Sequence, residues 1–259
     1  MSRAFTRAVS PHLAQCQLTH LSRVSIDAAK ATSQHKAYET AIEEAGFELV
    51  RLPELPDDPD AVFVEDTALI LGDHAVISRP GAPSRADETK STAEGLNDHF
   101  ELHWIEQGFL DGGDVLRIGQ TLYVGRSSRT NLAGIAALSE IVARIGLEAI
   151  EARLRDCLHL KTGTTLAGED SSGTPVLLFD ERCVDPTQFC GVEPFLVDPH
   201  ESSAANCVRV GSRIILPAGN PRTVDRLRNR GFHVVEVDVS ELQKAEAGVT
   251  CMSLIDDRA

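Results

Sequence analysis

The chain has 259 residues, of which 42% are hydrophobic and 25% charged, and its mean hydropathy is −0.11. This composition is typical of a globular protein whose length allows one or two domains. The formal net charge of −14 repels nucleic acids and anionic lipid surfaces, so we expect neither as a partner. No apolar run approaches about 18 residues and the first residues lack the apolar core of a signal peptide, so we expect a cytoplasmic protein.

The cysteines do not follow the spacing of a zinc site. The chain contains Cys16, Cys157, Cys183, Cys190, Cys207 and Cys251, and none of them forms a Cys-X-X-Cys pair. In a chain of this length without a secretion signal, free thiols in a reducing compartment are the usual state. We therefore expect no metal site and no cofactor.

Short polar or acidic segments that lead into apolar runs recur along the chain. They begin at Phe63, Leu110, His159, Asn206 and Cys251, so the intervals between them are 47, 49, 47 and 45 residues. A period of this size is typical of a repeat architecture.

Each repeat has the same internal order. Two apolar runs split by a turn, such as 117–121 or 209–213, predict a β-hairpin. A polar link follows, and then apolar residues at three- and four-residue intervals predict a helix, as over 131–146 and 223–231. A further strand then leads to the next repeat, so the unit is ββαβ.

The fifth unit has to combine both ends of the chain. The segment that begins at Cys251 supplies its first strand, and residues 1–62 supply a helix over 33–46 and the strands around it. The predicted fold is therefore α/β, a single domain over 1–259 of five ββαβ units with pseudo-fivefold symmetry. Joining the two chain ends closes the ring and protects the edges of its sheets.

The polar segments of a closed repeat fold are expected to face one central channel. They carry several carboxylates, a histidine, an asparagine and a cysteine: Glu65, Asp66, Asp111, Asp114, His159, Asn206 and Cys251. A cysteine nucleophile needs a histidine and a carboxylate close in space, not in sequence.

The chemistry of these side chains suggests a division of roles. A protonated His159 beside Cys251 would lower the pKa of the thiol and later protonate a leaving group. A carboxylate would orient the imidazole, and the other acids would suit a guanidinium. Each residue also has an ordinary structural explanation, since Cys251 could be a buried small residue and His159 a core histidine. Their shared phase within the repeat favours a site.

Nine segments together resemble the dimethylarginine dimethylaminohydrolase family, whose fold is a five-bladed α/β-propeller called a pentein. They are QHKAY (34–38), DAVFVED (60–66), ISRPGAPSR (77–85), LDGGDVL (110–116), SSRTN (127–131), LHLKTG (158–163), AANC (204–207), LPAGNPRT (216–223) and TCMSL (250–254). The resemblance covers nearly the whole chain.

The resemblance implies three catalytic residues. Cys251 would be the nucleophile, His159 the general acid and base, and Asp111 the carboxylate that orients the histidine. The implied reaction hydrolyses an Nω-methylated arginine to citrulline and methylamine or dimethylamine through a covalent thiouronium on the cysteine.

The resemblance also implies a set of substrate-binding residues. Asp60, Glu65 and Asp66 would bind the guanidinium end, and Arg85 and Arg129 the α-carboxylate. Leu18 matches a residue of a lid loop, and Ala245 matches a backbone-carbonyl contact to the substrate amine. The expected partner is this small molecule, and a homodimer is left open.

Three other functions stay as alternatives. An arginine deiminase or an amidinotransferase would use similar chemistry, although such proteins are usually longer. A non-catalytic guanidine-binding protein would keep the acidic pocket without turnover.

Overall fold

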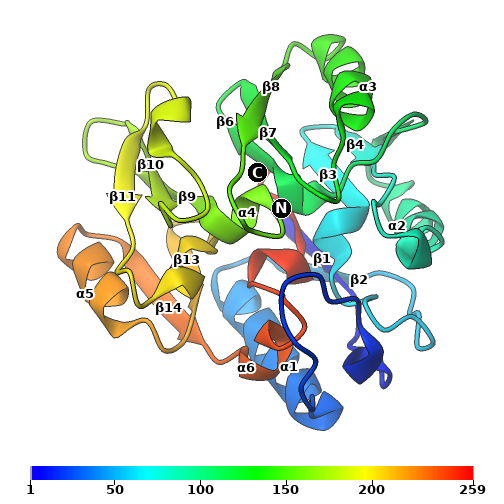
Figure 1. Ribbon diagram of the computed structural model, residues 1–259, viewed down its shortest axis with the longest axis horizontal. Coiled ribbons are helices and arrows are strands. Elements are labelled where there is room, and N and C mark those ends of the chain that lie inside the picture. The colour runs from blue at the N-terminus through cyan, green and yellow to red at the C-terminus, as the bar shows by residue number, and fades with distance from the viewer. Residues whose placement is uncertain (1, 259) are drawn as a thin grey trace.

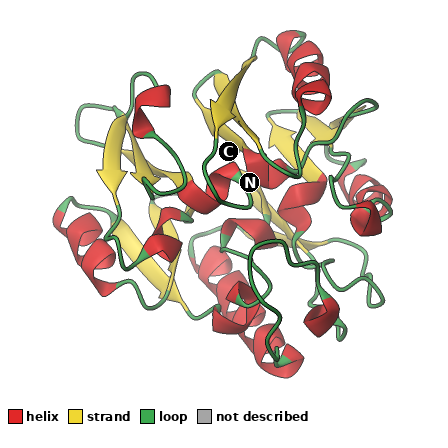
Figure 2. Ribbon diagram, viewed as in Figure 1, coloured by secondary structure: helices red, strands yellow, loops and turns green. Residues whose placement is uncertain are grey.

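The computed structural model describes residues 2–258, which form five three-stranded sheets arranged around a common centre (Figure 1). In every sheet the first strand pairs antiparallel with the second, and the second pairs parallel with the third. The longer helices lie on the outside of this arrangement (Figure 2). The predicted five-unit α/β fold is confirmed.

The strands follow the repeat in chain order. The five sheets are β15 (Leu254–Asp256), β1 (Arg3–Thr6) and β2 (Glu48–Arg51); β3 (Ala68–Leu71), β4 (His74–Ile77) and β5 (Glu101–Trp104); β6 (Val115–Ile118), β7 (Thr121–Arg126) and β8 (Glu148–Arg153); β9 (Thr164–Glu169), β10 (Pro175–Phe179) and β11 (Glu193–Leu196); β12 (Val208–Val210), β13 (Arg213–Pro217) and β14 (His233–Val237). The α-helices are α1 (Ala28–Glu44), α2 (Glu88–Leu96), α3 (Leu132–Ala143), α4 (Leu160–Gly163), α5 (Pro221–Asn229) and α6 (Ser240–Gln243).

The two ends of the chain meet in the first sheet, as predicted. Strand β1 pairs antiparallel with β15, with Phe5 opposite Leu254, and parallel with β2. Both side chains are buried and belong to one apolar cluster that also contains Val64 and Ile77 of the second unit. Burial of apolar surface thus stabilises the closure of the ring.

The helix of the first unit begins earlier than expected. Helix α1 starts at Ala28, and the side chain of Asp27 caps it by accepting a hydrogen bond from the backbone N–H of Lys30. Thr32 and Ser33 lie inside the helix, where their hydroxyls donate to the carbonyls of the preceding turn. These hydroxyl residues therefore do not mark the helix start, which explains the error in the prediction 33–46.

The fourth unit departs from the predicted ββαβ order. Between β10 and β11 the structure has a single 3₁₀ turn, Pro186–Gln188, and no α-helix. The side chain of Asp185 accepts a hydrogen bond from the N–H of Thr187 at 2.9 Å, which closes one turn. Gly191 then adopts a φ of 69°, a conformation that ends helical structure. The prediction of a helix in every unit is wrong here.

One short helical turn lies within two residues of the first strand of every unit, at or next to each polar segment of the repeat. The five turns are η2 (Val64–Thr67), η4 (Gly112–Asp114), α4 (Leu160–Gly163), η6 (Ser202–Ala205) and η7 (Thr250–Met252). Turn η2 contacts η4 and η7, and α4 contacts η4 and η6. Residues from all five units therefore converge at the centre of the ring.

The core is divided among the units rather than continuous. Five apolar clusters lie between neighbouring sheets and their helices, and the largest joins both chain ends through residues such as Tyr38, Val249 and Met252. Within residues 2–258, no helix is long and apolar enough to cross a lipid bilayer.

Candidate active site

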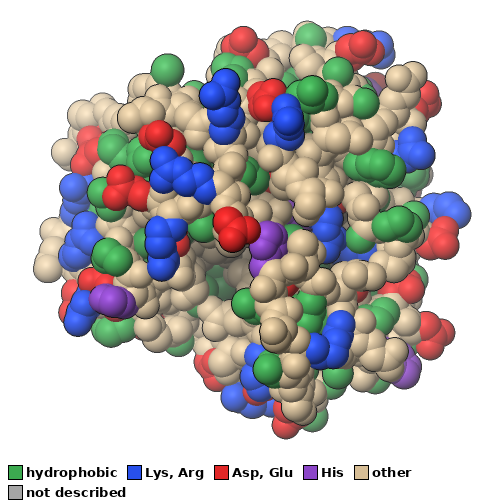
Figure 3. All heavy atoms as spheres, viewed as in Figure 1, with side chains coloured by type: hydrophobic (Ala, Val, Ile, Leu, Met, Phe, Trp, Pro, Cys, Tyr) green, Lys and Arg blue, Asp and Glu red, His purple; other side chains and the backbone are tan. Residues whose placement is uncertain are grey.

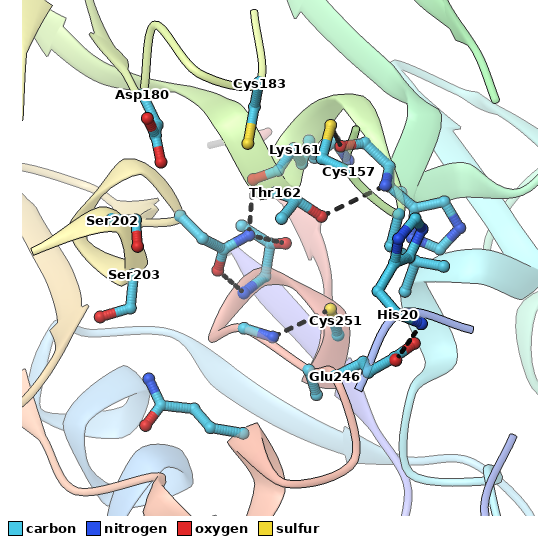
Figure 4. A pocket seen from close by; sticks show the side chains of 18 of the residues that line it. His20, Cys157, Lys161, Thr162, Asp180, Cys183, Ser202, Ser203, Glu246 and Cys251 are labelled. Atoms are coloured by element: carbon cyan, nitrogen blue, oxygen red, sulfur yellow. Dashed lines mark hydrogen bonds between the residues drawn. The ribbon is translucent and has the colours of Figure 1, made fainter. Parts of the chain in front are cut away.

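A cavity of about 480 Å³ opens where the helical turns meet, and four of the residues predicted to face the channel line it: Glu65, His159, Asn206 and Cys251. The space-filling view shows a hollow near the centre of this face (Figure 3). Figure 4 shows Cys251 at the base of the cavity, near Glu246, with Lys161 and Thr162 above it.

The turn that carries Cys251 is fixed by Asn206 of the neighbouring unit. The Asn206 side-chain oxygen accepts a hydrogen bond from the N–H of Thr250 at 3.1 Å, and its amide donates to Thr250 Oγ1 and to the Lys161 carbonyl, both at 2.9 Å. A Cβ on Gly248 would lie 2.1 Å from Asn206 Oδ1, so only glycine permits this approach. The N–H of Gly248 also donates to Cys251 Sγ at 3.4 Å.

His159 lies at the start of helix α4, between two carboxylates. Its Nε2 is 3.1 Å from Asp111 Oδ2, and its Nδ1 is 3.9 Å from Asp66 Oδ1. A Cβ on Gly113 would lie 2.8 Å from Nδ1, so the glycine allows the ring this close to the chain. The short contact orients the ring through Nε2 and leaves Nδ1 without a short hydrogen bond.

The acidic surroundings keep His159 protonated. Burial by itself favours the neutral ring, but the carboxylates of Asp66, Asp114 and Asp111 outweigh it and raise the pKa of His159 to about 9. The imidazolium can therefore donate a proton at neutral pH.

Asp114 fixes the position of His159 indirectly, through a hydrogen bond to the next residue, Leu160. Its carboxylate accepts hydrogen bonds from the N–H of Leu160 at 2.9 Å and from the Ser127 hydroxyl at 2.6 Å. Burial raises the pKa of Asp114 to about 6. The contact at Leu160 anchors the first turn of α4 and so holds the adjacent His159.

Glu65 joins the nucleophile to a cation that the sequence reasoning missed. One carboxylate oxygen accepts a hydrogen bond from Lys161 Nζ and the other from Thr250 Oγ1, each at 2.6 Å. Lys161 follows His159 by one residue in the segment LHLKTG, and this proximity was the available signal. Through these two hydrogen bonds, Glu65 connects the turn that carries Cys251 to helix α4, which follows His159.

A protonated His159 was expected to lower the pKa of the Cys251 thiol, but the structure favours a raised pKa. Burial, together with the carboxylates of Glu65 and Asp66, raises the pKa of Cys251 to about 12, while the Gly248 N–H and Lys161 oppose the shift. The carboxylates beside the sulfur therefore outweigh nearby positive charge, and the substrate-free pocket holds a thiol.

Arg85 lies behind Asp66, outside the cavity lining. Its guanidinium contacts Asp66 Oδ2 at 2.5 Å and Glu88 Oε2 at 2.7 Å, and donates to the Phe63 carbonyl at 2.8 Å. The side chain is 4% exposed, so its charge is committed to these partners. This geometry favours a role in holding Asp66, whereas the family resemblance implies a contact between Arg85 and the α-carboxylate of the substrate.

Arg129 lies nearer to solvent, beside the loop 17–21, which contains Leu18. Its Nη2 donates to Thr19 Oγ1 at 3.0 Å, and its Nη1 is 3.7 Å from Asp111 Oδ2. Asp60 also contacts this loop, because its carboxylate accepts the N–H of Gln17 at 3.0 Å. Leu18, between these contacts, packs partly buried against the apolar cluster of the chain ends.

Glu246 holds the loop 17–21 in place, and sequence reasoning did not identify it. Its carboxylate accepts hydrogen bonds from three successive backbone N–H groups, of Thr19, His20 and Leu21. Glu246 has a φ of 61°, and no other non-glycine residue within 2–258 has a positive φ. The preceding residue, Ala245, is buried. The strained backbone points the carboxylate at the loop, as Figure 4 shows for His20.

Asp66, Asp111 and His159 bring three potential metal ligands within 4.8 Å of one another. Their oxygens already accept hydrogen bonds: Gly113 N–H donates to Asp66 and Gly81 N–H to Asp111, at 3.1 and 2.8 Å. This arrangement suits a held imidazolium better than a cation site.

Two relatives that cover most of this chain carry the same enzyme name. No family model matches the chain. An N(G),N(G)-dimethylarginine dimethylaminohydrolase from Streptomyces coelicolor is 36% identical over 254 residues, covering 97% of this chain and 96% of the relative. One from Pseudomonas aeruginosa is 38% identical over 233 residues, covering 88% and 89%.

Solved structures agree with these relatives. A cysteine-to-serine mutant of the Pseudomonas aeruginosa enzyme complexed with citrulline has a TM-score of 0.91 and 35% identity, with 98% of each chain covered. A histidine-to-glycine variant of a dimethylarginine dimethylaminohydrolase, as an adduct with S-methyl-L-thiocitrulline, has a TM-score of 0.89 and 34% identity, covering 98% of this chain and 100% of that one.

A domain of an arginine dihydrolase, at 21% identity and a TM-score of 0.78, shares the fold alone. The identity over nearly the whole chain, together with the close structural match, shows that the protein belongs to the dimethylarginine dimethylaminohydrolase family.

Proposed function

We propose that this protein hydrolyses Nω-methylated L-arginines to L-citrulline and either methylamine or dimethylamine. The observation that supports this most directly is the meeting of Cys251, His159 and Glu65 at one cavity in a chain of this family. The relatives solved with citrulline and with a thiocitrulline adduct support the same substrate class.

The first step uses the positive charge of the substrate. In the free pocket, Glu65 and Asp66 disfavour a thiolate at Cys251. A bound guanidinium beside these carboxylates offsets their charge and so lowers the pKa of the thiol, which loses its proton to solvent. The Cys251 thiolate then attacks the guanidinium carbon.

His159 carries the proton in both halves of the reaction. In the first half, the imidazolium protonates the departing amine through Nδ1, the carbon–nitrogen bond breaks, and a thiouronium stays on Cys251. In the second half, neutral His159 takes a proton from water, whose oxygen attacks the same carbon. The carbon–sulfur bond then breaks, the thiolate leaves, and the remaining hydroxyl proton passes to solvent as the carbonyl of citrulline forms. Asp111 keeps the ring oriented through Nε2.

The remaining predicted residues are assigned to the other parts of the substrate. Arg129 is the residue best placed to bind the α-carboxylate, since its guanidinium is less committed than that of Arg85. We assign Leu18 and the Ala245 carbonyl to the amino-acid end of the substrate, because Leu18 belongs to the loop 17–21 and Glu246, which holds this loop, follows Ala245. Asp60, whose carboxylate accepts the N–H of Gln17, keeps its expected place at the guanidinium end.

We also propose three properties of the whole protein. All six cysteines are free, which suits a reducing cytoplasm. The chain ends share one sheet, which supports a single domain over 1–259. A homodimer is kept as a proposal, to be tested by solution mass.

The first prediction concerns substrate and nucleophile together. The purified protein should release citrulline from dimethylarginine and monomethylarginine much faster than from arginine, measured by a colorimetric citrulline assay. Cys251→Ser should abolish release, because a serine hydroxyl with no strong base is a far weaker nucleophile.

Cys190→Ser is the matched control, since Cys190 is exposed and outside the cavity. Preference for arginine would indicate a deiminase, and product only with an added amine acceptor would indicate an amidinotransferase. Tight binding without product would indicate a binding protein. Any of these results would refute the proposed function.

The second prediction follows from the raised pKa of His159. In the substrate-free protein, the resonance missing from His159→Gln should titrate near pH 9 in an NMR titration. Because the folded-state pKa lies above the ordinary value of about 6.5, this group stabilises the fold fully below pH 6.5. That stabilisation should disappear as the pH rises through about 9, measured by urea unfolding. A titration midpoint at or below pH 6.5 would contradict the conclusion that the surrounding carboxylates raise the pKa of His159.

The third prediction separates the two arginines. Arg129→Ala should raise KM for dimethylarginine by about 10- to 150-fold, which corresponds to about 1.5–3 kcal/mol of lost charge-assisted hydrogen bonding. It should matter little for a methylguanidine that lacks the α-carboxylate. Arg126→Ala is the control, because Arg126 is exposed in the same segment and lies 3.6 Å from Glu151, away from the cavity lining.

Arg85→Ala should act on the fold instead. It leaves the buried carboxylates of Asp66 and Glu88 without their partner, so we expect a loss of about 3–5 kcal/mol in the free energy of unfolding.

Equal kinetic losses on both substrates for Arg129→Ala would show that Arg129 does not bind the carboxylate.

A further inference from the structure

Three metal-ligating side chains meet on the second sheet, outside the candidate active site. His74 begins β4, and Glu101 and His103 lie on β5. The two strands are parallel, with His74 opposite Glu101. Glu101 and His103 are two residues apart and so point to the same face of the sheet. The register therefore places all three side chains together.

The distances among the donor atoms match those of a metal site. His103 Nε2 lies 3.1 Å from His74 Nδ1 and 3.8 Å from Glu101 Oε1, while His74 Nδ1 lies 3.4 Å from Glu101 Oε2. Ligand bonds of about 2.0–2.2 Å in a tetrahedral zinc site place neighbouring ligand atoms roughly 3.3–3.6 Å apart. Each pair of residues is thus spaced to within about 0.2 Å of such ligands, and the two contacts of Glu101 use different oxygens of its carboxylate.

Hydrogen bonding explains only part of this cluster. The 3.1 Å contact between the two rings fits a hydrogen bond from one imidazole to the other. The carboxylate, at 3.4 and 3.8 Å, is too far for a good hydrogen bond to either ring. A cation at the centre would explain why all three groups face one point.

The cluster is open to solvent and separate from the catalytic cavity. The side chains of His74 and His103 are 26% and 21% exposed. They line a hollow of about 640 Å³ next to the turn that ends β3, whereas Glu65 precedes the start of that strand. The full length of β3 therefore lies between this cluster and the catalytic residues.

Charged neighbours of both signs surround the three donors. Arg117 and Arg144 line the same hollow, and Arg117 Nε donates to the Gly119 carbonyl at 2.9 Å. Asp73, the residue before His74, accepts a hydrogen bond from Arg258. The two arginines would favour an anion or a water as the further ligand of a bound cation.

We propose that His74, Glu101 and His103 form a binding site for a divalent transition-metal ion of the zinc class. Two imidazoles and one carboxylate are ligands that suit zinc, cobalt and nickel ions. The exposed side of the cluster leaves the other coordination positions to water or a small anion. The site plays no part in the hydrolysis.

The test uses metal alone and a background that removes the competing thiolate. Cys251→Ser protein, freed of metal by chelator, is titrated with Co²⁺, followed by visible absorption, and with Zn²⁺, followed by calorimetry. One equivalent should bind. Adding His103→Ala or Glu101→Gln should weaken binding at least about tenfold, and His233→Ala, an exposed histidine elsewhere, should not.

Glu101→Gln keeps the size of an exposed side chain, so it tests the site even if His103→Ala alters the fold. Absence of bound metal in the Cys251→Ser protein would overturn the proposal. Unchanged affinity in both ligand variants would overturn it equally. Citrulline formation by the wild-type protein should be the same before and after chelation, and a loss restored by Zn²⁺ would contradict the separation from catalysis.

Discussion

The pairing of β15 with β1 is the interaction on which the rest of the site depends. Phe5 of β1 lies opposite Leu254 of β15, three residues after Cys251. The closed sheet therefore fixes the last helical turn, which carries Cys251, against the second unit. Chain ends usually fray because little holds them. Here the final segment is the first strand of a sheet, and an otherwise mobile cysteine gains a defined place beside Glu65.

Electrostatics then decides what the centre of the ring can bind. Each buried acid that acts on His159 has a partner: Asp66 has Arg85, Asp111 contacts the imidazole, and Asp114 accepts hydrogen bonds from Ser127 and the N–H of Leu160. These acids keep the imidazole protonated, while burial and the carboxylates of Glu65 and Asp66 leave the cysteine as a thiol. A cationic substrate would complete the balance, which couples recognition of a guanidinium to activation of the nucleophile.

Much of this architecture could be predicted from the sequence, because regular intervals report a repeat and the repeat implies a ring. The same phase brought Glu65, His159 and Cys251 to one cavity. The missing helix of the fourth unit could not be seen, since one side-chain cap at Asp185 decided it. Lys161 and Glu246 were missed because their partners, Glu65 and the backbone of residues 19–21, lie far away in sequence, and the buried contacts of Arg85 with Asp66 follow only from the fold. Periodicity predicts where a residue lies but not which neighbour it binds.

The most direct measurement is the mass of the protein trapped during turnover. The protein is mixed with dimethylarginine, quenched in acid within the first turnovers, digested and examined by mass spectrometry. The account predicts a peptide containing Cys251 whose added mass equals the substrate less dimethylamine. An adduct on another cysteine, or citrulline formed by the wild-type protein with no adduct on Cys251 at any quench time, would contradict Cys251 as the nucleophile.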